Sequence, residues 1–298
     1  MAVRRKQRGK PRAGFTLLAL LLAAIFCFSG YKLLDDLLTA RREQNTFASL
    51  AALKTQNAAT EAPTTPAPTP STEPTDAAPV VTTQEPDRKT EPDVEPTPAP
   101  EENTEPKPLP EYAQLYEMNP EFFGWLTAEA MELDYPVMHS PTRPEHYLNR
   151  DYYGEYSGSG TPFIDGRCPP DGNFFLIYGH RMQNKTVFGQ LSKYTEESFR
   201  NEHPMIYFDT VYEHREYEIM AVFYSQIYLS GERGVFRYYD YADLTDEATF
   251  TEYVRQVKAA AIYDTGIDAV YGDELIALST CNYHAEEGRL VVVAKRIV

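Results

Sequence analysis

Apolar residues follow three different patterns along the chain. A nearly continuous apolar run extends from Phe15 to Leu34, and residues 58–110 contain almost no large apolar side chain. From residue 111 onward, short apolar runs alternate with polar turns, a pattern typical of strands. About 20 apolar residues can cross a bilayer as a helix, whereas a segment poor in apolar residues cannot bury enough surface to fold. The pattern therefore predicts an apolar helix, a disordered spacer and one β-rich domain.

The N-terminal flank of the apolar run contains basic residues and no acidic residue. The basic residues are Arg4, Arg5, Lys6, Arg8, Lys10 and Arg12. A basic flank favours a cytoplasmic N-terminus, so we expect a single-pass protein of the cell membrane: residues 1–14 cytoplasmic, 15–34 a transmembrane helix, and the folded domain outside. The alternative is a cleaved signal peptide, but the run is long for one and Ser29-Gly30-Tyr31 is a poor cleavage site.

Two further segments separate this run from the folded domain. Residues 35–57 have an amphipathic helical pattern, which predicts a helical stalk next to the membrane. Residues 58–110 are rich in proline, threonine and glutamate, and such a segment in polyproline II conformation, at about 3.1 Å per residue, reaches on the order of 150 Å. We interpret it as a spacer, either a plain linker or a tether that carries the folded domain outward.

For the folded domain, residues 111–298, the sequence pattern predicts mainly strands. Residues 111–126 have an apolar helical face and predict a helix or helix pair broken near Pro120 and Gly124. Two further helices are predicted over residues 245–261 and, more briefly, 185–194. Strands are predicted over residues 133–138, 161–164, 173–178, 205–208, 216–228, 275–278 and 290–294. Many strands and few helices indicate an all-β barrel or sandwich with helical insertions.

The composition of the chain argues against several classes of partner and site. The formal net charge of -16 argues against a nucleic-acid partner. Three cysteines, Cys27, Cys168 and Cys281, cannot form a disulfide framework. The chain has no Cys/His cluster with zinc spacing and no glycine-rich phosphate loop, so we expect neither a metal nor a cofactor.

Cys281 is the first candidate for chemistry. It follows Thr280 at the end of an apolar strand, and Arg289 begins the next strand after a seven-residue polar turn. In a hairpin these two ends are neighbours, and a guanidinium beside a thiol favours the thiolate. A lone cysteine at a strand end is more often a small buried residue, so a nucleophile also requires a proton carrier.

His180 is the best candidate for that proton carrier. It follows an apolar strand and Gly179, and strand ends are where barrels present functional groups. Imidazole titrates near neutral pH and can transfer protons, although a histidine that merely ends a strand is an equally good interpretation. The other five histidines lie in polar or loop-like stretches: His139, His146, His203, His214 and His284.

These residues together resemble the motifs of the sortases, membrane-anchored cysteine transpeptidases of Gram-positive bacteria. The resemblance rests on Tyr178-Gly-His180, on Leu278-Ser-Thr-Cys281 and on the following Arg289, and it covers about residues 112–298. Class B fits best, because Phe123-Gly-Trp-Leu126 and Val187-Phe-Gly-Gln-Leu191 look like class B segments. Two departures are Ala277, where threonine is usual, and Arg143-Pro144, where Asp-Asn is usual.

The resemblance implies a fold and a site. The fold is mainly β, an eight-stranded sortase-type barrel with an N-terminal helix and an inserted helix before the cysteine strand. His180, Cys281 and Arg289 become the catalytic residues, with Arg181 and Arg296 as alternatives for the arginine. Tyr178, Ser279 and Leu148 fall where class B enzymes line the peptide groove. No metal is implied, and Cys168 is interpreted as a bystander in a loop.

The resemblance also implies a reaction. The enzyme cleaves a C-terminal sorting signal of a surface protein after threonine, and a thioester then passes the protein to an amine of a peptidoglycan precursor of the lipid II type. The alternatives are a pilin-polymerising sortase, a hydrolytic cysteine peptidase and a non-enzymatic wall or receptor protein. Anchoring is preferred to polymerisation because no lid motif precedes Glu111 and the chain ends at Val298, directly after a strand.

Overall fold

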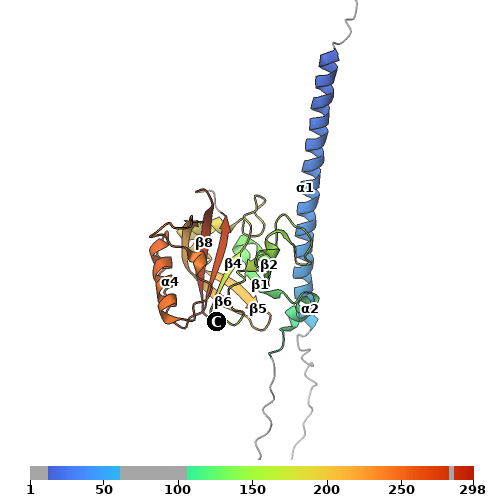
Figure 1. Cartoon of the computed structure of the whole chain (residues 1–298). Helices are drawn as coiled ribbons and strands as arrows, with labels where there is room; N and C mark the ends of the chain where they lie inside the picture. The colour runs from blue at the N-terminus through green and yellow to red at the C-terminus, as the bar shows by residue number, and fades with distance from the viewer. Residues whose placement is uncertain (1–12, 61–105, 282–284) are drawn as a thin grey trace, which may run out of the picture.

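A computed structural model describes residues 13–60, 106–281 and 285–298, and its centre is a closed β-barrel (Figure 1). Within these residues the strands are β1 Phe122–Ala128, β2 Leu133–His139, β3 Phe163–Ile164, β4 Phe174–Tyr178, β5 Met205–Thr210, β6 Glu216–Gln226, β7 Leu275–Cys281 and β8 Gly288–Arg296. Their order around the barrel is β1-β2-β3-β4-β7-β8-β6-β5. The predicted eight-stranded barrel is therefore confirmed.

Strand pairing brings distant segments together at one end of the barrel. β7 runs antiparallel to β8, with Cys281 directly opposite Arg289, as the hairpin interpretation predicted. On its other side β7 pairs in parallel with β4, and Tyr178 lies opposite Ser279. The C-terminal ends of β4 and β7 therefore lie side by side, next to the start of β8. The apolar run that ends at Cys281 is buried up to Thr280 because both of its edges are paired inside the barrel wall.

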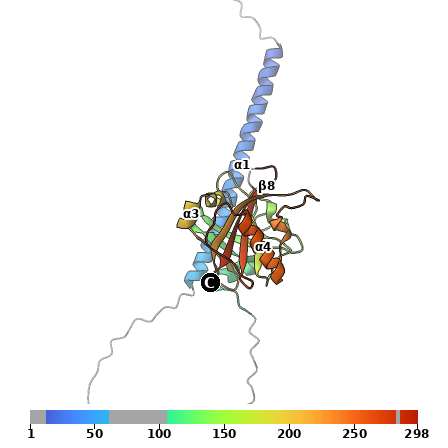
Figure 2. The same cartoon turned by 90° about the vertical axis from the view of Figure 1, so that its left-hand side faces the viewer.

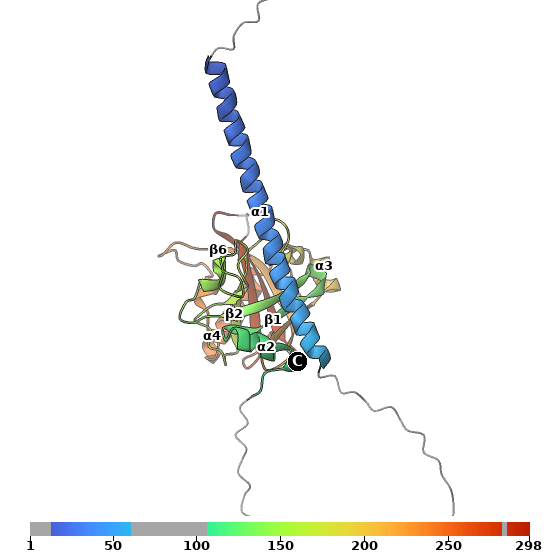
Figure 3. The ribbon, with the colours of Figure 1, turned by 90° about the vertical axis from the view of Figure 1, so that its right-hand side faces the viewer.

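Helices cover two opposite sides of the barrel. The α-helices are α1 Ala13–Thr60, α2 Pro110–Met118, α3 Glu197–Glu202 and α4 Glu247–Ala260. Short 3-10 helices are η1 Glu129–Met131, η2 His146–Asn149, η3 Leu191–Thr195 and η4 Tyr238–Asp240. Figure 2 shows α4 on the near side of the barrel with α1 behind it, and Figure 3 shows α1 running along the opposite side.

The helix inserted between β6 and β7 is α4, and it corresponds to the helix predicted over residues 245–261. Its first turn is capped by Asp246, which accepts a hydrogen bond from Thr249 N at 2.8 Å.

Helix α1 contradicts the expected membrane localisation. Among the helices of residues 13–60, 106–281 and 285–298, none is long and apolar enough to cross a membrane. The single-pass localisation in the cell membrane, expected from residues 15–34, is therefore wrong. The apolar run is not a separate element but the start of one 48-residue helix, which continues through charged positions such as Arg41, Arg42 and Glu43. Residues 1–12, and residues 61–105 of the predicted spacer, lie outside the described part of the chain.

Two predicted helices differ from the structure. The helix predicted over residues 111–126 ends at Met118, and Phe122–Ala128 forms strand β1. The chain turns at Asn119, whose side chain accepts a hydrogen bond from Glu121 N at 3.0 Å, and Pro120 cannot donate one. The helix predicted over residues 185–194 is reduced to η3, because Lys185 and Val187 have positive φ angles of 67° and 52° that no right-handed helix accommodates.

Candidate active site

All six residues proposed from the sequence line one cavity of about 630 Å³. The cavity lies where β4 and β7 end and β8 begins, and η2 contributes its far wall. The six are Leu148, Tyr178, His180, Ser279, Cys281 and Arg289. Other lining side chains, which sequence reasoning did not select, include Phe163, Asp165, Arg167, Ile227, Tyr239 and Glu287. The fold therefore gathers a thiol, an imidazole and a guanidinium in one cleft.

The thiol sits at a rigid strand end but is itself accessible. Cys281 is the last residue of β7 and is exposed. Immediately before it, Thr280 Oγ1 donates a hydrogen bond of 2.7 Å to Gly179 O, and Gly179 N donates one of 3.2 Å to Ser279 O. These bonds tie the end of β7 to the end of β4. The sulfur is therefore presented from a fixed backbone, as a nucleophile requires.

Arg289 faces Cys281 across the hairpin and is held by its own end of β8. Its Nη1 donates to Glu287 O at 3.1 Å and to Gly288 O at 3.0 Å, and Nη2 lies 3.6 Å from Glu287 Oε2. Only about 20% of the side chain is exposed. Because the guanidinium has five N–H donors, these contacts leave donors for a further group in the cavity.

His180 is fixed at both its ring and its backbone. Its Nε2 lies 2.7 Å from Leu148 O, and a carbonyl oxygen can only accept, so this assigns the proton to Nε2. Its backbone carbonyl accepts a hydrogen bond of 3.0 Å from Phe188 N. Leu148 was proposed from the sequence as a groove residue; the structure adds that its carbonyl orients the imidazole. A backbone carbonyl has no signature in the sequence, so this contact could not have been predicted.

Gly179 must be a glycine for His180 to take its place. A Cβ at this position would lie 2.6 to 2.8 Å from the Phe188 ring, which is itself fully buried. We expect Gly179→Ala to destabilise the fold by about 1–3 kcal/mol, the usual cost of overpacking, and to lower the rate by displacing His180. Thermal unfolding and steady-state kinetics measure the two effects.

The matched control for Gly179→Ala is Gly30→Ala. Gly30 is a helical glycine with nothing within 4 Å of the added Cβ, so its replacement should lower neither stability nor rate. Wild-type stability and rate in Gly179→Ala would show that the Phe188 ring moves aside at no cost.

Two of the residues that line the cavity, Asp165 and Arg167, form an ion pair. Asp165 accepts from Arg167 Nε at 2.9 Å and Nη2 at 2.7 Å, and from Tyr178 OH at 3.2 Å. Burial alone would raise the pKa of Asp165, but the hydrogen bonds and charge of Arg167 outweigh it and hold that pKa below its usual value. Burial raises the pKa of Tyr178 well above its usual range, so the phenol stays neutral and donates to the carboxylate.

Ser279 is less available than the sequence suggested. The residue is about 1% exposed, and its hydroxyl lies 2.7 Å from the hydroxyl of Tyr238, a residue of η4. Burial raises the pKa of Tyr238 to about 12, so this phenol is also neutral. Ser279 therefore supports the cavity wall through a partner that the sequence did not indicate.

The remaining cysteine of the barrel is not part of the cavity. Cys168 is about 1% exposed, and burial raises the pKa of its thiol to about 12, so it stays protonated and unreactive near neutral pH. His139, expected in a loop, is instead the buried last residue of β2. No group of three His, Cys, Asp or Glu side chains that could hold a metal occurs among the described residues.

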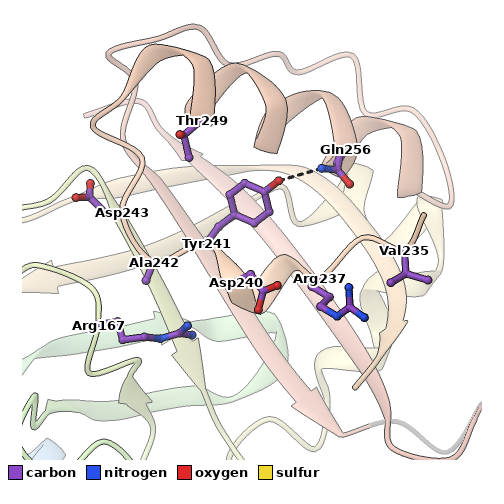
Figure 4. A pocket seen from close by; sticks show the side chains of 9 residues that line it. All are labelled: Arg167, Val235, Arg237, Asp240, Tyr241, Ala242, Asp243, Thr249 and Gln256. Carbon is purple, nitrogen blue, oxygen red and sulfur yellow. Dashed lines mark hydrogen bonds between the residues drawn. The ribbon is translucent and has the colours of Figure 1, made fainter. Parts of the chain in front are cut away.

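A second pocket of about 470 Å³ adjoins the first through Arg167 and lies beneath α4 (Figure 4). Tyr241 crosses it and accepts a hydrogen bond of 2.9 Å from Gln256 Nε2. Its second arginine, Arg237, donates to Leu229 O and Glu232 O, both at 2.9 Å. The described residues that line this pocket include neither a thiol nor an imidazole, so the larger cavity is the candidate active site.

Comparison with known proteins identifies similar sequences and structures. A family model described as the sortase domain matches residues 126–297. Sortase B of Listeria monocytogenes is 30% identical over an alignment of 194 residues that covers 63% of this chain and 74% of that protein. The crystal structure of sortase B from Bacillus anthracis in complex with AAEK1 is 28% identical, with a TM-score of 0.55 over 64% of this chain and 87% of that one. A substrate complex of Staphylococcus aureus sortase B is 25% identical, with a TM-score of 0.56 over 64% and 86%.

Proposed function

This chain belongs to the sortase family of cysteine transpeptidases, in class B, and from that premise we propose its reaction in detail. It cleaves the C-terminal sorting signal of a surface protein after threonine and joins the protein, through a thioester on Cys281, to an amine of a peptidoglycan precursor of the lipid II type. The observation that carries the proposal is the shared cavity of Cys281, His180 and Arg289 at the end of the barrel.

In the first half-reaction, the Cys281 thiolate attacks the carbonyl carbon of the threonine. A tetrahedral intermediate forms, and the Arg289 guanidinium donates hydrogen bonds to its oxyanion. The carbon–nitrogen bond then breaks, and protonated His180 gives its proton to the leaving amine. The products are the released C-terminal peptide and a thioester between Cys281 and the threonine.

In the second half-reaction, an acceptor amine attacks the thioester. His180 takes the proton of the amine, the carbon–sulfur bond breaks, and the Cys281 thiolate is regenerated. The new bond is an amide between threonine and the acceptor. Arg289 donates hydrogen bonds to the second oxyanion from the same position. The same three residues therefore catalyse both half-reactions.

The walls of the cavity suit an extended peptide. Leu148, Phe163 and Ile227 supply apolar surface, while Tyr178 and the Asp165–Arg167 pair supply polar groups. A volume of about 630 Å³ is within the range of sites for ligands the size of a few residues. The solved substrate complex of the S. aureus relative supports the assignment of a peptide substrate to this cleft.

Arg289→Ala is expected to lower kcat/KM by about 100-fold, because it removes a donor to both oxyanions. Arg289→Lys should recover part of that loss, since it keeps the charge but not the planar fork of donors. Peptide cleavage followed by chromatography measures the rates. Arg255→Ala is the matched control: Arg255 is exposed on α4 and pairs with Glu252 on the same helix. Full activity in Arg289→Ala would move the oxyanion role to another group, with Arg181 as the next candidate.

The reaction itself is tested with peptides. The full-length chain is incubated with LPxTG-like and NPxTN-like peptides, each with and without triglycine as the amine, beside Cys281→Ala, and the products are read by mass spectrometry. A ligated product that is absent with the variant establishes transpeptidation and names the motif. Cleavage without ligation, in the presence of the amine, indicates a hydrolytic peptidase. No cleavage of any peptide contradicts the proposed substrate class.

A further inference from the structure

One face of helix α1 is buried against the barrel, although about fifty residues separate α1 from α2 in sequence. The face consists of Glu43, Phe47, Leu50 and Lys54, whose spacing places all four on the same side of a helix. Leu50 is about 1% exposed and Phe47 about 7%. Lys54 Nζ lies 2.9 Å from Asp134 Oδ1 and 4.4 Å from the centre of the Trp125 ring. Helix α1 therefore packs as part of the folded domain, beside β1 and β2 (Figure 3).

Glu43 accepts hydrogen bonds from the loop of residues 157–159. A single carboxylate oxygen, Oε1, accepts hydrogen bonds from Ser157 Oγ at 2.8 Å, Gly158 N at 2.7 Å and Ser159 N at 3.4 Å. Two of these donors are backbone groups of consecutive residues, and hydrogen bonds to a charged acceptor are the strong ones. Glu43 thus fixes the path of residues 157–159.

That loop holds the segment that orients His180. Ser157 N donates to Asn149 O at 3.1 Å, and Thr161 N donates to Tyr147 O at 3.0 Å. Between them, Gly160 approaches so closely that an added Cβ would lie 2.3 Å from Leu148 O. This carbonyl is the acceptor for His180 Nε2. A continuous set of hydrogen bonds and backbone contacts therefore connects Glu43 to the catalytic imidazole.

Phe47 is linked through intervening residues to the backbone of the same histidine. Its ring packs edge-on against Tyr135, with ring centres 4.8 Å apart. Tyr135 OH accepts a hydrogen bond of 3.0 Å from Val187 N, and Val187 forms a β-bridge with Arg181. The following residue, Phe188, donates its N–H to His180 O. The turn after His180 is therefore also connected to α1, through Tyr135 and Val187.

We propose that helix α1 is a built-in part of the catalytic unit and that Glu43 and Phe47 are positioning residues for His180. Glu43 fixes the ring through Leu148 O, and Phe47 fixes the backbone through Tyr135 and Val187. The inference rests on the proposed role of His180 in proton transfer. It extends the functional unit from the barrel to a helix that precedes it by a long segment of chain.

The test is Glu43→Ala in the full-length chain, with Gln44→Ala as the matched control on the exposed side of the same helix. We expect kcat to fall by about tenfold in Glu43→Ala, because a small displacement of a proton-transfer group is costly, while KM stays within about twofold. Glu43→Gln keeps an acceptor oxygen and should recover most of kcat. Gln44→Ala should match the wild type.

A double-mutant cycle separates positioning from general stability. In a His180→Ala background, Glu43→Ala should lower the residual rate no further, because the residue that it positions is gone. An equal fall in both backgrounds would assign Glu43 a purely structural role and overturn the inference, as would an unchanged kcat in Glu43→Ala.

A measurement without turnover keeps the inference separate from the proposed function. With ¹⁵N-labelled histidine in the chain, the NMR spectrum of the wild type should show the signal of a hydrogen-bonded His180 Nε2–H. Glu43→Ala should change the chemical shift of this signal, and Gln44→Ala should not. If the wild-type chain ligated no peptide but this signal shifted, the proposed reaction would fail while the link from α1 to His180 stood. An unchanged signal in Glu43→Ala would overturn the link whatever the activity.

Discussion

Replacing Cys281 with alanine is expected to abolish both cleavage and ligation, a loss of at least about 10⁴-fold in kcat/KM. The reason is chemical: without the sulfur no thioester can form, and oxyanion stabilisation alone gives only weak catalysis. The fold should be unaffected, because Cys281 is exposed at the end of β7, and the hydrogen bonds of the Thr280 hydroxyl and the Ser279 carbonyl to Gly179 do not involve the Cys281 side chain. Mass spectrometry should also detect a thioester-linked peptide on the wild-type chain but not on the variant.

Cys168→Ala is the matched control for the thiol. Cys168 is buried in the barrel core and protonated, so its removal should cost about 1 kcal/mol of stability through a small cavity and leave kcat/KM within about twofold. Ligation that persisted in Cys281→Ala, or that was abolished in a folded Cys168→Ala, would reassign the nucleophile.

The barrel and the position of Cys281 opposite Arg289 could be predicted because both depend on local pattern. Short apolar runs bounded by turns define strands, and a seven-residue turn between two such runs sets a hairpin in which Cys281 meets Arg289. The same reasoning failed at residues 122–126. Their aromatic residues fit a helical face, but pairing with β2 and β5 makes them a strand, because tertiary contacts override local preference.

Other parts of the site depend on contacts that no local pattern encodes. The Asp165–Arg167 pair is close in sequence, yet its place beneath Tyr178 follows from the pairing of β3 with β4. The hydrogen bond of His180 to Leu148 O joins segments 32 residues apart through a backbone atom. The amphipathic pattern of α1 could be recognised in the sequence, but the surface against which α1 packs could not. That surface belongs to residues that follow a long segment, and no local pattern in the sequence pairs them with α1.

His180→Ala is expected to lower kcat/KM by about 10³- to 10⁴-fold, because the described residues that line the cavity include no second imidazole to carry the proton in either half-reaction. Part of the loss should return on addition of free imidazole, which can enter the cavity left by the ring. Stability should fall only slightly, since the substitution removes one hydrogen bond, the one to Leu148 O. Peptide cleavage with and without imidazole, beside thermal unfolding, measures these effects.

His180→Gln distinguishes proton transfer from support of the wall. A glutamine amide can still donate to Leu148 O but cannot exchange protons near neutral pH, so we expect wild-type stability with the same loss of rate as in His180→Ala. His214→Ala is the control, because His214 is about 61% exposed and pairs with Glu111 and Asp209, outside the cavity. If His180→Gln kept most of the wild-type rate, the role of the imidazole would be limited to its hydrogen bond with the Leu148 carbonyl. The proton would then have to reach the leaving amine from solvent.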